Sequence, residues 1–305
     1  MINQAAGHTS LADALIWDAV DHDVSVIHLQ PDEGGYAIRY RAEGELDILL
    51  QLSSIAFSAL DRQLTSRSTP VRTENKRRLF LDRKTSAGVE SLQVRYQKLE
   101  TFSGERLTLN IIPQSRMPRS VDDITDSPEE AATLRRWSQA PKGLVLVSGR
   151  SGSGKTTTSF VCLEEVARPR DRVIFTIEES VEFLLPNVEQ VEVDLNDTRA
   201  CRDAFDAVFA SDLDVLFVTS SLSSDHQKSL CRHALSAAES GHLVFVQLDA
   251  VSPEDARQIF ETAVERDIED QLVGITWQEL SRDAETGRRS AHYEFVPGPL
   301  GVEQG

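Results

Sequence analysis

The chain has 305 residues, of which 40% are hydrophobic and 27% charged, so it can form two modest domains with a sizeable core and is not expected to be disordered over most of its length. Its 32 Lys and Arg oppose 49 Asp and Glu, a formal net charge of -17 that repels polyphosphate backbones and makes nucleic acid an unexpected partner. The chain has three cysteines without paired spacing, Cys162, Cys201 and Cys231. This spacing indicates neither a set of disulfides nor a four-thiolate zinc site, and it fits a reducing cytoplasm.

The first third of the chain alternates between helical and strand periodicity. Apolar residues recur at helical spacing over residues 11–20 and 55–64, which predicts two helices. Period-two alternation predicts strands over residues 24–28, over 36–49 as a pair about a turn at Glu43 and Gly44, and over 91–96 and 107–112 about a turn at Ser103 and Gly104. These elements predict an N-terminal α+β domain over residues 10–113, in which His28 is interpreted as a structural histidine.

A polar, poorly periodic stretch then separates two domains. Residues 114–127 are predicted to form a linker, and Ser127 with Pro128 predicts the start of a helix that runs to Trp137. Short apolar runs rich in β-formers follow, separated by helical stretches, at residues 144–147, 173–177, 215–218 and 243–248. This alternation predicts a mostly parallel sheet covered on both faces, so residues 128–305 are expected to form an α/β domain.

The sequence GRSGSGKT, from Gly149 to Thr156, matches the phosphate-binding pattern G-x-x-x-x-G-K-[ST] between a predicted buried strand and a predicted helix. Glycines let backbone N–H groups turn toward phosphate oxygens, Lys155 reaches the β- and γ-phosphates, and the Thr156 hydroxyl can ligate Mg²⁺. The residues expected to bind a nucleotide are Gly149, Ser151, Gly152, Ser153, Gly154, Lys155, Thr156 and Thr157, with Thr156 also holding the metal. The loop alone does not distinguish adenine from guanine, or a motor from a kinase or switch.

Several segments resemble the traffic ATPases of type II secretion and type IV pili, a family of hexameric motors. VSVIHLQP (residues 24–31) and IRYRAEGEL (38–46) resemble that family's N-terminal domain, and VRYQKLETFSGERLTL (94–109) resembles its arginine-bearing segment. TIEESVE (176–182) is similar to its acidic box, and HALSAAESGHLVFVQLDA (233–250) to the region of its histidine box. The resemblance covers nearly the whole chain.

The resemblance implies a RecA-like P-loop NTPase core, an α/β fold with a mostly parallel sheet, preceded by a smaller α+β domain. It implies ATP and Mg²⁺ as cofactors, Glu178 as the catalytic carboxylate, and Arg95 and Arg106 as charge stabilisers. It also implies a homo- or hetero-oligomeric ring in the cytoplasm that meets the inner membrane through a platform protein. No run reaches the roughly 20 apolar residues needed to cross a bilayer, so no direct membrane span is expected.

Two boxes of that family are altered in this sequence. Thr219 and Ser220 stand where the family has Gly-Glu at a strand end, and Asp249 stands where it has a histidine. The first change removes a carboxylate that would hold the Mg²⁺ shell or orient water, and an ionised Asp249 would repel a γ-phosphate. Because such groups can be worth about 10³-fold in rate, the leading hypothesis is an ATP-binding subunit with weak or no hydrolysis and a regulatory or structural role.

Two alternatives stay open. One is an active ring motor ATPase that drives secretion or pilus assembly or retraction, with Glu178 as base and a displaced Glu or His serving if the boxes are misaligned. The other is an adaptor that binds no nucleotide and docks on a membrane platform protein. Asp225 and His226 are interpreted as loop polarity rather than as parts of a catalytic dyad, because no third orienting group is evident.

Overall fold

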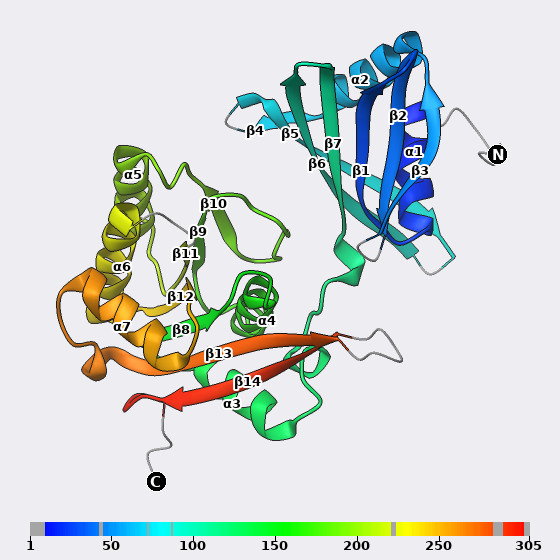
Figure 1. Ribbon diagram of the computed structural model, residues 1–305. Coiled ribbons are helices and arrows are strands. Elements are labelled where there is room, and N and C mark those ends of the chain that lie inside the picture. The colour runs from blue at the N-terminus through cyan, green and yellow to red at the C-terminus, as the bar shows by residue number, and fades with distance from the viewer. Residues whose placement is uncertain are drawn as a thin grey trace. The chain divides into compact units, whose positions relative to one another are not determined.

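The computed structural model describes residues 10–42, 45–71, 73–86, 88–220, 224–282 and 289–301 (Figure 1). The chain divides into two compact units, Met1–Met117 and Pro118–Gly305, and the division falls within the predicted linker. The predicted turn at Glu43 and Gly44 lies outside the described residues. In the described part of the chain, every helix is too short or too polar to cross a bilayer.

The N-terminal unit is an antiparallel sheet with helices against one of its faces (Figure 1). The helices are α1 (Leu11–Asp21) and α2 (Ser54–Arg67), and a short 3₁₀ helix, η1 (Gln114–Arg116), follows the last strand. The strands are β1 (Val24–Asp32), β2 (Gly35–Ala42), β3 (Glu45–Leu52), β4 (Thr69–Val71), β5 (Thr73–Thr85), β6 (Gly88–Thr101) and β7 (Gly104–Pro113). Their order is β3-β2-β1-β7-β6-β5-β4, and the α+β class predicted for this unit is confirmed.

Local sequence accounts for most of these elements. The side chains of Ser10 and Ser53 accept hydrogen bonds from backbone N–H groups in the first turns of α1 and α2, which satisfies donors that a helix leaves unpaired. The patterns did not predict β4 and β5. Most of β5 is charged, and its buried positions, Leu79 and Leu81, are too few to establish a period.

The second unit is a mixed sheet built around parallel strands. Its strands are β8 (Gly143–Gly149), β9 (Ile174–Glu178), β10 (Glu189–Glu192), β11 (Val215–Ser220), β12 (Leu243–Asp249), β13 (Leu272–Arg282) and β14 (Arg289–Pro297), in the order β10-β9-β11-β12-β8-β13-β14. Its helices are η2 (Val121–Asp123), α3 (Pro128–Ser138), α4 (Lys155–Ala167), α5 (Thr198–Phe209), α6 (Ser224–Glu239), α7 (Pro253–Val264) and η3 (Glu269–Gln271). Among the described strands of this second sheet, only β14 pairs antiparallel with its neighbour, and the predicted α/β class is confirmed.

Helices cover both faces of this sheet (Figure 1). On one face, Phe160 of α4 lies edge-on to Phe217 of β11, with ring centroids 5.8 Å apart. On the other face, Phe205 of α5 and Phe260 of α7 share a buried cluster with Val246 of β12. Strands buried on both faces read as continuous apolar runs, which is why the sequence predicts β8, β9, β11 and β12.

The acidic excess of the chain belongs to the second unit. Residues 1–117 hold 14 Lys or Arg and 15 Asp or Glu, whereas residues 118–305 hold 18 and 34. An anion that binds the second unit therefore meets a net repulsive field. Its attraction has to come from groups in the immediate site.

Candidate nucleotide site

The predicted phosphate loop connects β8 to α4 at the carboxyl edge of the sheet. Gly149 has a φ of 150°, and a Cβ there would lie 2.3 Å from the backbone oxygen of Gln278, so a larger residue does not fit. Gly154 has a φ of 89° and directly precedes α4, whose first N–H groups are left open toward the loop. The loop therefore has the backbone shape of an anion cradle at a helix N-terminus.

Lys155 closes the base of this loop. Its side chain is only 5% exposed, and Nζ donates hydrogen bonds to the backbone oxygens of Gly149 at 3.0 Å and Arg150 at 2.8 Å. The same nitrogen lies 2.8 Å from Oδ1 of Asp249, the last residue of β12. The sequence identified Asp249 only as a replacement for a histidine, and its ion pair with the loop lysine was not predicted.

Buried polar atoms under the loop test whether a ligand fits. Gln278 of β13 donates from Nε2 to the backbone oxygen of Ser153 at 2.8 Å. Ser153 Oγ, Gln247 Oε1 and Gln278 Oε1 are buried without a hydrogen-bond partner among the described residues. Unpaired buried polar atoms are costly and mark places where a ligand or ordered water bonds. Of these three atoms only the Ser153 hydroxyl can donate to a phosphate oxygen, whereas the two amide oxygens suit ordered water. Together with the half-buried Thr156 residue and the buried Lys155, the Ser153 hydroxyl gives the loop groups that fit a phosphate chain and its metal ion.

Glu178 ends β9 at the same edge of the sheet. Its carboxyl group is 2% exposed and accepts hydrogen bonds at Oε1 from Thr176 Oγ1 at 2.6 Å and from Gln190 Nε2 at 3.2 Å. Burial raises the pKa of Glu178 to about 7, against the two hydrogen bonds, which lower it. A carboxyl group that titrates near neutral pH can exchange a proton with a reacting group, as a general base must.

The strand register shows what surrounds Glu178. Ile177 lies opposite Val218 of β11, so Glu178 is next to Thr219, which in turn lies opposite Gln247 of β12. Thr219 and Ser220 are the last two residues of β11, so no carboxylate stands at that strand end. Residues 221–223 lie outside the described part of the chain, as do the side chains of Asp225 and His226.

Arg95 and Arg106 belong to the N-terminal unit, whereas the other predicted site residues belong to the second unit. Arg95 of β6 lies opposite Asn110 of β7, and Arg106 is on the same face of β7, away from α1 and α2. Nη2 of Arg106 is 3.1 Å from Nδ1 of His28. Burial, followed by the charge of Arg106, lowers the pKa of His28, which favours a neutral imidazole that accepts this hydrogen bond.

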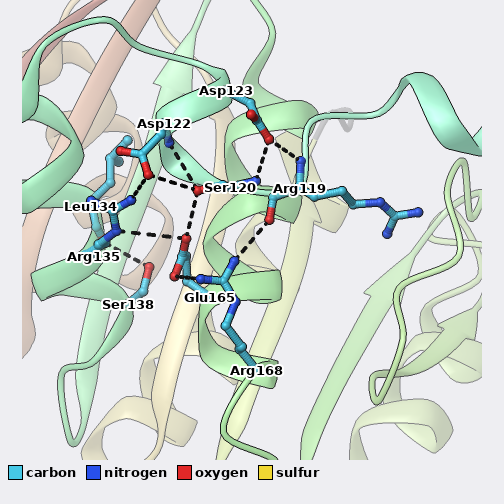
Figure 2. Close-up of polar contacts among 9 residues, drawn as sticks. All are labelled: Arg119, Ser120, Asp122, Asp123, Leu134, Arg135, Ser138, Glu165 and Arg168. Carbon is cyan, nitrogen blue, oxygen red and sulfur yellow. Dashed lines mark hydrogen bonds and ion pairs between the residues drawn. The ribbon is translucent and has the colours of Figure 1, made fainter.

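The far end of α4 is tied to the segment that follows Met117 (Figure 2). Arg119 pairs with Glu164, and Arg168 pairs with Glu165 at 3.0 Å while donating to the backbone oxygen of Arg119 at 3.3 Å. Asp123 accepts the backbone N–H of Arg119 at 2.9 Å. The helix that begins at Lys155 is therefore anchored at its other end by one ion pair and one hydrogen bond to a segment 45 to 49 residues away in the sequence, which periodicity does not detect.

Comparison with known proteins places these features in a family. A family model described as type II/IV secretion system protein matches residues 3–296. Type II secretion system protein HxcR of Pseudomonas aeruginosa is 26% identical over 248 residues, 79% of this chain and 51% of the relative. Type IV pilus assembly ATPase PilB of Acinetobacter baylyi is 27% identical over 238 residues, 77% of this chain and 40% of the relative. The chain thus spans about half the length of the curated relatives it matches.

Solved structures agree on the fold. The pilus retraction motor PilT, solved with bound ADP, aligns with a TM-score of 0.67 at 21% identity over 95% of this chain and 84% of that one. The ATPase DotB of Legionella pneumophila aligns with a TM-score of 0.69 at 18% identity, over 97% and 83%. These neighbours share a RecA-like core with a preceding N-terminal domain. Since the family model spans nearly all of its residues, this chain belongs to the type II/IV secretion system protein family.

Proposed function

We propose that this chain is an ATP-binding subunit of a type II secretion or type IV pilus machine, with weak or no hydrolysis and a regulatory or structural role. The observation that carries the proposal is the position of Lys155, buried at the base of a glycine loop where β8 meets α4. Family membership supports it, since relatives are named as secretion proteins and pilus assembly ATPases.

The loop residues from Gly149 to Thr157 would hold the nucleotide. The open backbone N–H groups of the loop and of the first turn of α4 would contact the phosphates, and the Thr156 hydroxyl would ligate Mg²⁺. The metal ion would neutralise charge on the β- and γ-phosphates. Because the second unit is acidic, this local cradle has to overcome the repulsion of the surrounding field.

Weak hydrolysis is proposed from the neighbouring strand ends. Ser220 ends β11 where the resemblance implies a carboxylate, and Asp249 places a negative charge beside Lys155. Both changes remove groups that would stabilise charge developing on a transferring phosphoryl group. Retention of the loop without these groups supports a subunit that holds its nucleotide.

An active motor is the second candidate, and one observation favours it. Glu178 is buried with a pKa of about 7, which suits a general base. In that case Arg95 and Arg106 would act as charge stabilisers. Under either candidate, we propose a homo- or hetero-oligomeric ring in the cytoplasm that docks on an inner-membrane platform protein, as the family membership supports.

Calorimetry of ATP with Mg²⁺, followed by phosphate release in the same preparation, tests the proposal. We expect Lys155→Ala to weaken ATP binding about 100-fold, because a charge-assisted contact to phosphate is lost. Lys142→Ala, which removes an exposed lysine just before β8, is the matched control and should bind as the wild type does.

The outcomes separate the candidates. Binding that depends on Lys155 without phosphate release above background supports the proposed subunit. Release that disappears in both Lys155→Ala and Glu178→Gln would make the chain an active motor. Failure of the wild type to bind ATP would favour an adaptor that uses the fold without a nucleotide.

A further inference from the structure

We propose that Asp249 makes this site discriminate against nucleoside triphosphates, so that the loop holds a nucleoside diphosphate in preference. This inference rests on the proposed nucleotide binding and identifies which form of the nucleotide the site selects. Asp249 is thereby a specificity-determining residue.

The first argument is the contact itself. Nζ of Lys155 lies 2.8 Å from Asp249 Oδ1, and the lysine is 5% exposed whereas the carboxylate side chain is 51% exposed. In a loop of this pattern the lysine contacts the β- and γ-phosphates. Here a carboxylate of the protein already occupies one side of that ammonium group. A phosphate oxygen that approaches from the same side competes with Asp249.

The second argument is that the backbone of Asp249 cannot withdraw. Asp249 pairs with Gly149 in the register of β12 and β8, and Ala250 donates its N–H to the backbone oxygen of Gly149 at 3.2 Å. The backbone oxygen of Ala250 in turn accepts a hydrogen bond from Trp277 Nε1 at 3.2 Å. The carboxylate can rotate, but its Cα stays against the first residue of the loop whatever the loop holds.

The third argument is electrostatic. A triphosphate carries about one more negative charge than a diphosphate, and that charge is on the terminal group, which the lysine contacts. A carboxylate within about 6 Å of that group, half exposed and therefore partly screened, is expected to weaken triphosphate binding about tenfold relative to diphosphate binding. Lys155 is the only cation that pairs with Asp249 among the described residues.

A calorimetric comparison of ADP and ATP, each with and without Mg²⁺, tests the inference on the full chain. The wild type is expected to bind ADP more tightly than ATP. Asp249→Asn, and independently Asp249→Ser, should shift the ratio of the two dissociation constants about tenfold toward ATP. Glu239→Gln is the matched control: it neutralises an ion-paired carboxylate at the C-terminal end of α6, at the edge of the sheet opposite the loop, and should leave the ratio unchanged.

Three results would overturn the inference. An unchanged ratio in both Asp249 variants shows that the carboxylate is not a determinant. A loss of ATP affinity that appears in those variants only with Mg²⁺ makes Asp249 a metal ligand, which is the opposite role. Failure of the wild type to bind either nucleotide removes the proposed function as well, whereas the first two results leave it standing.

Discussion

The phosphate loop and the ends of β11 and β12 lie along one edge of the same sheet. The loop retains the residues that the family resemblance implies, whereas the two strand ends do not. The loop keeps Lys155 and Thr156 on a backbone that close contacts hold in shape, as at Gly149. The ends of β11 and β12 carry Thr219, which is half-buried, and Asp249, which is exposed. If the proposed function holds, binding a phosphate chain and hydrolysing it depend on separate groups at this edge of the sheet.

The loop should be the less tolerant of the two regions, and Gly149→Ala is expected to give the largest effect. The added Cβ would meet the Gln278 backbone oxygen at 2.3 Å in a strained φ of 150°, so we expect a loss of about 3 kcal/mol or more in the free energy of unfolding. Gly152→Ala is the control, because its φ is 80° but no atom lies within 4 Å of the new Cβ, and about 1 kcal/mol should be lost. Equal urea midpoints for the two variants would contradict the argument.

Glu178→Gln is expected to stabilise the protein in a pH-dependent way. Because the folded state holds the Glu178 proton up to a pKa of about 7, stability falls as pH rises from about 4.5 to about 7 and stays reduced above it. Glutamine accepts the same bonds from Thr176 and Gln190 without a charge. We expect a gain of about 2 kcal/mol at pH 8 that shrinks steadily toward pH 5, measured by urea denaturation. An identical gain at both pH values would mean that ionisation is not the cause.

Gln278→Met tests whether β13 supports the loop. The substitution removes the hydrogen bond to the Ser153 backbone oxygen, so we expect about 1 to 2 kcal/mol of lost stability and nucleotide binding weakened several-fold. Glu279→Gln, at the exposed neighbouring position of the same strand, should change stability by less than about 0.5 kcal/mol. If the two variants unfold at the same urea concentration, β13 does not support the loop.

The smallest stability effect is expected at the strand end. Asp249→Asn breaks an ion pair of 2.8 Å, but the carboxylate is half exposed and Lys155 keeps two backbone oxygens as acceptors. We expect a change of about 1 kcal/mol or less in the free energy of unfolding, measured by thermal denaturation. A much larger loss would show that Asp249 is part of the framework of the loop, and the contrast between the two regions would disappear.

Much of the fold could be predicted, and the gaps have a physical pattern. The buried parallel strands were identified because burial on both faces produces continuous apolar runs. The strands β5, β13 and β14 were missed, and β5 is mostly charged with only alternate residues buried. The β13–β14 hairpin contributes directly to the site. Gln278 of β13 donates a hydrogen bond to the loop, and the hydroxyl of Tyr293 in β14 lies 2.9 Å from Thr158 Oγ1 of α4.

The sequence by itself determined the phosphate loop, because eight contiguous residues between a strand and a helix carry the glycines, the lysine and the threonine that the chemistry needs. It also identified which strand-end residues depart from the related motors. Only the tertiary structure decided how these residues interact. Three features show this: the contact between Lys155 and Asp249, the hydrogen bond from Gln278 to Ser153 across 125 residues, and the buried environment that raises the pKa of Glu178. Periodicity and spacing report local structure, and those interactions arise only when the sheet has assembled.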